Sequence, residues 1–432
     1  MSDAERAPSK QQPSLTAAFA SVTTLFFAWG LITSLVDPLV AAVKSIFTLS
    51  NLEAQLSAFA FFIAYGVFSI PAAMLVARLK SVWSVVLAIC LMIVACLIIM
   101  GAANIDTYEG VLCGLFVMAS GITILQVAAN PLAAALGPPE KSHFRLTFSQ
   151  AFNALGTVVG PLVGAHLLLD GIEVPEGEML TETVRDGALG SIDFAFLIIS
   201  LLLAALAIFI WFSRKKIKAG DVSETGAMGF AQTLKEVRSS KWALLGGAAI
   251  FLYVGSEVAI GTQMALFLND DAIWSMSLQQ AGYYVSFYWF GAMVGRFLGS
   301  ALLLRIRAPV LMAAATACAA LLCLFVLVVG GVPAGYAALA IGLFNSIMFP
   351  VIFSITLERS SAAQEATSGF LCMSIIGGAF LPLMAGSIAD AAGYVMAFIV
   401  PLVGYVLLHV FAQMAMRSKV VAADDHDVAP IH

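Results

Sequence analysis

The stretch ILQVAANP, Ile124–Pro131, has a counterpart in FNSIMFP, Phe344–Pro350. In each stretch a side-chain amide, Gln126 or Asn345, stands five residues before a proline, and the two amides are 219 residues apart. Both stretches lie in long apolar runs, where amides need partners and prolines interrupt helical hydrogen bonding. The shared spacing predicts that the two stretches occupy equivalent places in two related halves of the molecule.

Three further pairs of short motifs repeat in the same way along the chain. Their offsets drift only between 221 and 227 residues. The pairs are FFAWG (26–30) with FLYVG (251–255), Arg78-x-Lys80 with Arg305-x-Arg307, and PLVGA (161–165) with PLMAG (382–386). Parallel repeats of this kind are typical of transporters that bind substrate near the midplane between two halves.

The composition of the 432 residues indicates a membrane protein. Hydrophobic residues make up 61% of the chain and charged residues 11%, against about 25% charged residues in soluble domains. A soluble chain could not cover so much apolar surface, so we expect a lipid bilayer to surround it. The first 16 residues are polar and of mixed charge, unlike a cleaved signal peptide.

Twelve apolar runs are long enough to span a bilayer, which takes about 20 residues each. A basic stretch, 214–241, separates the sixth run from the seventh. The sequence therefore predicts an all-α membrane protein with a tail (1–16), a six-helix half (17–213), a linker (214–241), a second six-helix half (242–416) and a second tail (417–432). The runs are 17–43, 52–77, 82–103, 108–136, 143–169, 192–213, 242–268, 279–304, 309–329, 334–357, 366–390 and 393–416.

The Lys and Arg residues predict the orientation, because they concentrate in cytoplasmic loops. With both termini in the cytoplasm, 18 of the 21 fall on that side; Lys44 and Arg185 fall outside and Arg296 within a run. This orientation makes 170–191 an external, acidic loop.

Few ionisable residues lie well inside the runs, where they are costly and usually functional, and three stand out. They are Asp37 in the first run, Glu257 in the seventh and Arg296 in the eighth. A carboxyl group surrounded by lipid can take up a proton, so Asp37 and Glu257 are the candidate proton-coupling residues. Arg296 is the candidate gating residue. The alternative is that one of the carboxylates simply pairs with Arg296.

Five amides and several aromatic residues in the runs are candidates for substrate binding. Amides both donate and accept hydrogen bonds, which suits a ligand rich in hydroxyl groups, and a flat ring can pack on the apolar face of a sugar. For the amides, hydrogen bonding between helices is the alternative; for the rings it is ordinary packing. The candidates are Gln126, Gln150, Asn153, Gln263 and Asn345, with Trp289 and Phe349 as stacking walls.

No motif in the chain indicates enzyme chemistry. There is no phosphate-binding G-x-x-x-x-G-K-[ST] loop, no metal-ligand cluster and no nucleophile constellation in the sequence. The six cysteines lie in apolar runs without a C-x-x-C pair. We expect no disulfide, metal, cofactor or nucleic-acid partner, and a monomeric carrier, not an enzyme, that is driven by an ion gradient or by its substrate's own gradient.

Together these motifs resemble the fucose–galactose–glucose:proton symporter family of the major facilitator superfamily. The resemblance runs from about Phe26 to Ala412. It rests on FFAWGLITSLVDPL, LQVAANP, LGPPEKSHFRLTFSQAFNALGT, FLYVGSEVAIGT, YWFGAMVGRF and GLFNSIMFPVIFS. It implies a twelve-helix fold, alternating access and proton-driven sugar uptake across a bacterial inner membrane.

The resemblance also implies roles for individual residues. Asp37 matches the family's proposed coupling aspartate, and Gln150 and Asn153 match its sugar contacts. The L-fucose branch has a glutamate where this chain has Gln126 and a tyrosine where it has Phe349. These departures favour the glucose/galactose branch, which also includes carriers of N-acetylglucosamine and other hexoses.

The sequence therefore favours import of a neutral hexose coupled to protons. Other sugars, such as mannose, fructose, fucose or N-acetylglucosamine, and sodium coupling stay open. An exporter of drugs or metabolites with the same fold is a second hypothesis, and a sensor that does not transport is a third.

Overall fold

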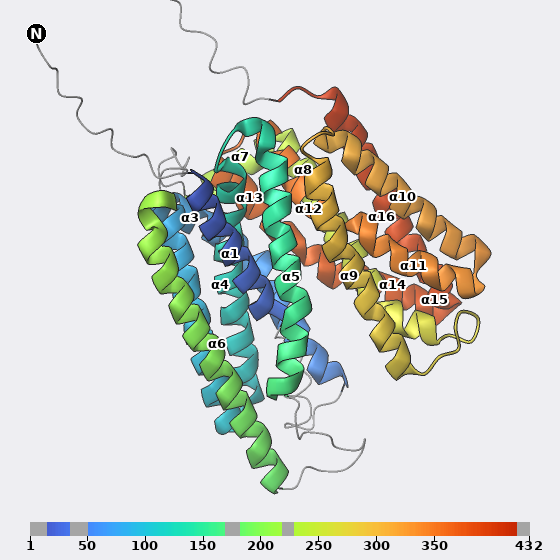
Figure 1. Cartoon of the computed structure of the whole chain (residues 1–432), viewed down its shortest axis with the longest axis horizontal. Helices are drawn as coiled ribbons and strands as arrows, with labels where there is room; N and C mark the ends of the chain where they lie inside the picture. Colours follow the sequence, from blue (N-terminus) through green and yellow to red (C-terminus); the bar gives the residue numbers. More distant parts are fainter. Residues whose placement is uncertain (1–14, 35–50, 169–181, 218–228, 421–432) are drawn as a thin grey trace, which may run out of the picture.

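The computed structural model describes residues 15–34, 51–168, 182–217 and 229–420, which form helices joined by turns (Figure 1). The first half of the chain contributes the helices α1 (Leu15–Ser34), α3 (Asn51–Asn104), α4 (Tyr108–Ala135), α5 (Ser142–Leu168) and α6 (Glu182–Ile217). A short helix, α7 (Phe230–Ser239), follows in the linker.

The second half contains more helical segments because two of its spans are interrupted. The segments are α8 (Lys241–Asn269), α9 (Leu278–Leu302), α10 (Ala308–Val329), α11 (Gly331–Asn345), α12 (Met348–Arg359), α13 (Gln364–Met373), α14 (Gly377–Ala392), α15 (Tyr394–Ala397) and α16 (Ile399–Arg417). The chain passes from α11 to α12 through Ser346 and Ile347, and from α13 to α14 through a 3-10 turn, Ser374–Ile376.

The twelve predicted spans are confirmed. Among the described residues, eight helical segments are long and apolar enough to cross a membrane. One of them, Ala60–Asn104, contains a turn and comprises two predicted spans. The helices α1, α5 and α9 supply the remaining three.

The second and third spans are separated at Lys80, inside α3. Its φ of 65° and ψ of 166° leave the helical region, in a conformation that is almost confined to glycine and costs about 1–3 kcal/mol in other residues. The break lies between the predicted runs 52–77 and 82–103. The backbone of Lys80 therefore holds a strained turn that joins two antiparallel spans.

Replacing this residue should relieve the strain. We expect Lys80→Gly to raise the free energy of unfolding by about 1 kcal/mol, because glycine adopts this conformation freely. Lys80→Ala is the matched control, since it removes the same charge but keeps the Cβ atom. Thermal unfolding in detergent measures both variants; equal melting temperatures would argue against strain at this turn.

Two predictions need correction, one about a connecting loop and one about the continuity of two spans. The expected external loop 170–191 is wrong for its last ten residues, because α6 already begins at Glu182. These ten residues are mostly polar and continue the helix beyond the apolar part of the span, so hydropathy did not indicate them. The tenth and eleventh runs were also expected as single helices, but each is interrupted.

The repeated motifs FFAWG and FLYVG end in glycines that allow close helix packing. Gly30 of α1 faces the backbone carbonyl of Asn153 on α5, and Gly255 of α8 faces the carbonyl of Gly377 where α14 begins. A Cβ atom at either glycine would collide with these neighbours. The two glycines therefore hold corresponding helix pairs together, as small residues do in membrane bundles.

Large apolar side chains also cover the outside of the bundle. Phe212 is 76% exposed, Val328 74% and Leu383 66%, which would be unfavourable in water. Buried apolar residues fill the inside of both halves. Apolar residues both inside the bundle and on its outside are expected for a helix bundle that is surrounded by lipid.

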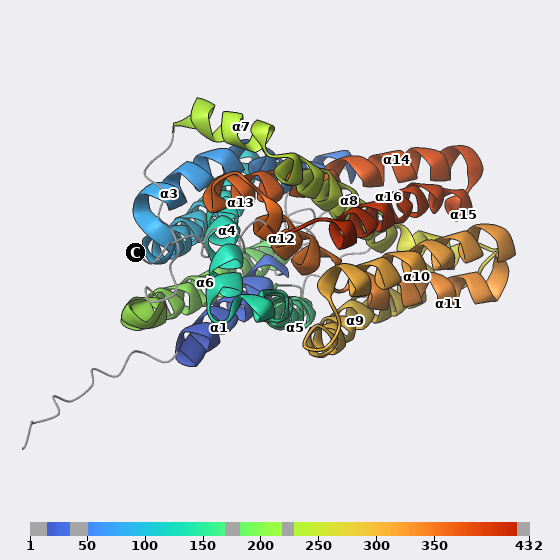
Figure 2. The same ribbon diagram turned by 90° about the horizontal axis from the view of Figure 1, so that it is seen from above.

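The two halves converge at one end of the bundle and spread apart toward the other (Figure 1). The helices α3, α4 and α5 contact α9, α12 and α13 across the boundary. We call the convergent end, where α4 joins α5 and α12 joins α13, the closed end. The helix α7 lies at this end, along the outer edge of the molecule (Figure 2).

Candidate substrate and coupling site

The amides of the first half are bound to other residues of that half. Gln126 on α4 is 5% exposed and donates from Nε2 to the hydroxyl of Tyr65 on α3 at 2.8 Å. Gln150 on α5 donates to Oδ1 of Asn130 on α4 at 3.0 Å. Asn153, one turn further along α5, donates to the carbonyl of Phe26 at 3.1 Å. The predicted amides of this half thus lie on adjacent helices.

The second half contains the charged group of the candidate site. Glu257 on α8 accepts a hydrogen bond from the hydroxyl of Tyr253 at 2.7 Å. Its Oε1 also lies 3.6 Å from Nη2 of Arg296 on α9. The side chains of Glu257 and Arg296 are 12% and 14% exposed. The pairing of a carboxylate with Arg296, left open by the sequence, is present for Glu257.

Asn345 belongs to the same group but is fully buried. Its Nδ2 donates to the hydroxyl of Tyr288 at 2.6 Å, and that hydroxyl donates to the backbone carbonyl of Glu257 at 3.2 Å. Tyr288 therefore joins α8, α9 and the end of α11. The predicted contact of Asn345 with sugar stays a prediction, while its contact between helices is established.

The two repeated amides make the same bond in the two halves. Gln126 donates to Tyr65, which lies in the second span, and Asn345 donates to Tyr288, which lies in the eighth. Each pair ties corresponding helices together. The amide that ILQVAANP and FNSIMFP share therefore has the same structural role in both halves, which is to donate a hydrogen bond to a tyrosine of a neighbouring helix.

The repeated prolines have a shared role as well. Proline has no N–H to give to the carbonyl four residues earlier in a helix, so Pro131 frees the carbonyl of Val127 and Pro350 frees that of Ser346. Ser368 of α13 donates to the Val127 carbonyl at 2.9 Å, and Arg296 donates to the Ser346 carbonyl at 3.0 Å. The first of these bonds connects the two halves, and the second anchors Arg296.

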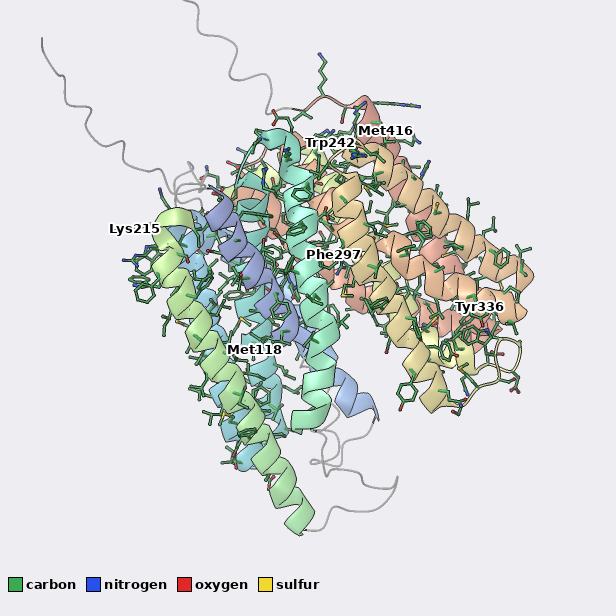
Figure 3. All side chains as sticks on the ribbon, viewed as in Figure 1. Met118, Lys215, Trp242, Phe297, Tyr336 and Met416 are labelled. Carbon is green, nitrogen blue, oxygen red and sulfur yellow. The ribbon has the colours of Figure 1, made fainter. Side chains whose placement is uncertain are left out.

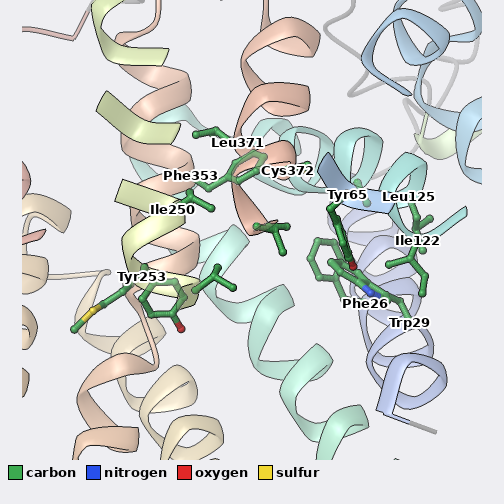
Figure 4. Close-up of a cluster of buried hydrophobic side chains, with 14 of the residues drawn as sticks. Phe26, Trp29, Tyr65, Ile122, Leu125, Ile250, Tyr253, Phe353, Leu371 and Cys372 are labelled. Atoms are coloured by element: carbon green, nitrogen blue, oxygen red, sulfur yellow. The ribbon is translucent and has the colours of Figure 1, made fainter. Parts of the chain in front are cut away.

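The aromatic candidates lie beside the charged group. Trp289 is 36% exposed and packs against Gly261 of α8. Phe349 is partly buried, with its ring 6.4 Å from that of Tyr253. Figure 4 shows Tyr253 in the second half and Tyr65, with Phe26 and Trp29, in the first.

Gln263 is not part of either group. Gln263 donates to the carbonyl of Pro382 at 3.4 Å and lines a small crevice of about 10 Å³ between α8, α14 and α16. It is therefore separate from Glu257. Asp37 lies outside the described residues, and its coupling role stays a prediction.

The closed end contains a polar latch between the halves. His143 at the start of α5 lies 3.2 Å from Oε2 of Glu358 on α12 and 2.6 Å from the hydroxyl of Ser354. Ser142 donates to Oε1 of Glu358 at 2.6 Å. Of the ion pairs between described residues, this one joins the two halves. We call these four residues the latch.

Aromatic rings of α5 and α9 also pack between the halves. Phe297 of α9 lies between α5 and α9 (Figure 3), with its ring 5.8 Å from Phe152 and 6.3 Å from Phe148. Phe297 follows Arg296 directly in the sequence. A movement of α5 against α9 would therefore act on the helix turn that holds Arg296.

Sequence reasoning missed several partners in this arrangement. Tyr253 lies four residues before Glu257, a spacing that places both on one helix face, so this contact was visible in the sequence. Tyr65 and Tyr288 could have been found by aligning the two repeats. The latch joins residues 211 and 216 positions apart, and no local pattern marks it.

Three groups of known proteins are similar to this chain. A family model described as Major Facilitator Superfamily matches residues 18–370. A glucose/galactose transporter of Brucella abortus is 37% identical over 401 residues, which are 93% of this chain and 94% of the relative. A putative glucose/galactose transporter of Helicobacter pylori is 34% identical over 414 residues, which are 95% and 99% of the two chains.

A solved structure has the same arrangement of helices. The crystal structure of the Escherichia coli fucose:proton symporter has a TM-score of 0.82 and 26% identity, and the match covers 94% of this chain and 100% of that one. A second structure of this symporter, described as being in the outward conformation, gives the same values. The family match over most of its length shows that this chain belongs to the Major Facilitator Superfamily.

Proposed function

We propose that this chain is a secondary carrier that imports a neutral hexose of the glucose or galactose type together with protons. The observation that carries the proposal is the buried Glu257 carboxylate on a spanning helix, held by Tyr253 and Arg296. A membrane-embedded carboxyl group can change its charge during transport. The relatives named for glucose and galactose, and the fucose:proton symporter, support the substrate class and the coupling ion.

Sugar binds between the halves in this proposal. Gln126, Gln150 and Asn153 offer amides from the first half, and Trp289 and Phe349 offer rings from the second. Protonation of Glu257 or Asp37 permits the halves to rock, and sugar and proton leave on the other side. Only a difference in interaction between the two states can couple the two ligands.

We assign the closed end to the cytoplasmic side, because the Lys and Arg residues concentrate there. The described arrangement is then the outward-facing state, in agreement with the similarity to a symporter in the outward conformation. The carrier is a multi-pass protein of a bacterial inner membrane and works as a monomer. It is not an enzyme.

Uptake by proteoliposomes tests the proposal. The purified carrier is supplied with glucose, galactose, mannose, fructose, fucose or N-acetylglucosamine under an imposed pH gradient. We expect accumulation of glucose or galactose that collapses when a protonophore removes the gradient. Uptake that follows a sodium gradient at fixed pH would show that sodium, and not the proton, is the coupling ion. The absence of uptake of any of these sugars would refute the sugar assignment.

Gln126→Ala tests whether this amide also contacts sugar. Because a hydrogen bond contributes about 1 kcal/mol, we expect roughly five- to tenfold weaker sugar affinity with the pH dependence of transport retained. Tyr65→Phe is the control, since it removes only the partner hydroxyl. Equal losses of affinity in both variants would mean that Gln126 acts only as a tie between helices.

A further inference from the structure

The helix α7 forms a strap between the two halves at the closed end. Its inner face carries Thr233 and Val237, both buried, and Val237 packs against Ala243 and Ala366. It contacts α3 of the first half and α13 of the second. The strap therefore rests on both halves at the end where they meet.

The inner face of the strap is hydrogen-bonded to the loop between α12 and α13. The hydroxyl of Ser240, the residue that caps the end of the strap, lies 3.0 Å from the hydroxyl of Ser360 and accepts from the N–H of Ser361 at 3.2 Å. Glu236 accepts from the N–H of Ala363 at 3.1 Å, at the start of α13. This loop follows Glu358 of the latch directly, so the strap and the latch share one short segment.

The exposed part of the strap, which we call its outer face, combines apolar and basic side chains. Phe230 and Leu234 are 53% and 43% exposed and border the face that buries Thr233 and Val237, because residues three, four and seven apart share one side of a helix. Lys235 and Arg238 are exposed beyond them, and the exposed Lys241 follows at the first position of α8. An apolar pair rimmed by bases is the pattern of a helix that lies in a membrane interface and attracts anionic lipids.

The strap lies next to the start of a spanning helix. The strap ends one residue before α8, a spanning helix that begins at Lys241. It lies at the outer edge of the bundle beside α3 (Figure 2). A helix that leads directly into a span from the edge of the molecule runs along the boundary between bilayer and water.

We propose that the outer face of α7 binds the anionic phospholipid headgroups of the leaflet at the closed end and thereby keeps the halves together there. Phe230 and Leu234 insert between the lipids, and Lys235, Arg238 and Lys241 bind the phosphates. Because the inner face holds the loop after Glu358, bound anionic lipid favours the closed latch. Each base near an anionic surface strengthens the attraction about fivefold.

A spin label on Ala231→Cys measures the docking directly. The six native cysteines are first replaced, and the full-length carrier is reconstituted in phosphatidylcholine vesicles with or without one third phosphatidylglycerol. We expect the label to be shielded from a water-soluble nickel complex, and accessible to oxygen, only with phosphatidylglycerol. A label that stays exposed to water in both vesicles, or is shielded equally in both, would overturn the proposal.

Charge-neutral variants identify the residues responsible. The double variant Lys235→Gln/Arg238→Gln should lose the response to phosphatidylglycerol and should resemble the parent protein in neutral vesicles. Arg305→Gln/Arg307→Gln removes basic charge from the α9–α10 turn and is the matched control, which should keep the response. If the control loses the response as well, the effect belongs to overall charge and not to α7.

Discussion

Glu257→Gln should abolish sugar accumulation driven by a pH gradient and leave sugar exchange intact. A pH difference of one unit stores about 1.4 kcal/mol per proton, which supports about tenfold accumulation. Glutamine keeps the size and hydrogen bonding of the side chain but cannot release a proton. We therefore expect the ratio of internal to external sugar to fall from about ten to about one, while counterflow of labelled sugar continues.

The partner of Glu257 requires a second variant. In Glu257→Gln the guanidinium of Arg296 loses the carboxylate 3.6 Å away, and an unpaired buried charge costs about 3–5 kcal/mol. Part of any loss could then reflect instability. Glu257→Gln/Arg296→Met removes both charges, so it should unfold at a higher temperature than the single variant and still fail to accumulate sugar.

Asp37→Asn distinguishes the two candidate coupling residues. If Asp37→Asn abolishes accumulation and the double variant keeps it, then Glu257 serves only to hold Arg296. If both lose accumulation, coupling requires both carboxyl groups. Measuring the sugar ratio and counterflow in the same vesicles separates coupling from sugar binding.

The fold could be predicted from the sequence because its signals are local and repeated. Each span is a continuous apolar run, and the spacing of an amide and a proline recurs at Gln126 and Asn345. The strained backbone of Lys80 was not predicted, because a hydropathy pattern carries no information about the φ and ψ angles of a turn. The helical start of α6 was missed for a related reason, because Glu182 begins a polar part of the helix.

The candidate site was only partly predictable, because its partners come from distant segments. The sequence showed that Glu257 and Arg296 are charged residues within apolar runs, where burial in lipid is energetically costly, and it left open whether the two form an ion pair. It did not show that Tyr288 connects Asn345 to the backbone of Glu257. Nor could it show that the carbonyl freed by Pro131 accepts from Ser368 of the opposite half, because that contact exists only after the halves assemble.

Glu358→Ala should open the closed end. The variant removes the contacts of Glu358 with His143 and Ser142, at 3.2 and 2.6 Å. Hydrogen bonds to charged groups contribute about 1.5–3 kcal/mol each, so the ratio of molecules closed at this end to molecules open there should fall by at least tenfold. The bond of Ser368 to the Val127 carbonyl remains, so Ser368→Ala should add to the effect.

Spin labels on opposite halves of the closed end measure this change. Lys141→Cys and Arg305→Cys are exposed positions outside the latch, and double electron–electron resonance gives the distance between labels placed there. Glu358→Ala should broaden the distribution toward longer distances, whereas Glu140→Ala, which removes an exposed carboxylate from the same region, should not. In Glu358→Ala the imidazole of His143 keeps its contact with the hydroxyl of Ser354 at 2.6 Å, so adding His143→Ala should shift the distribution further toward longer distances. A distance unaffected by Glu358→Ala would mean that ring packing at Phe297, and not the polar latch, holds the halves together.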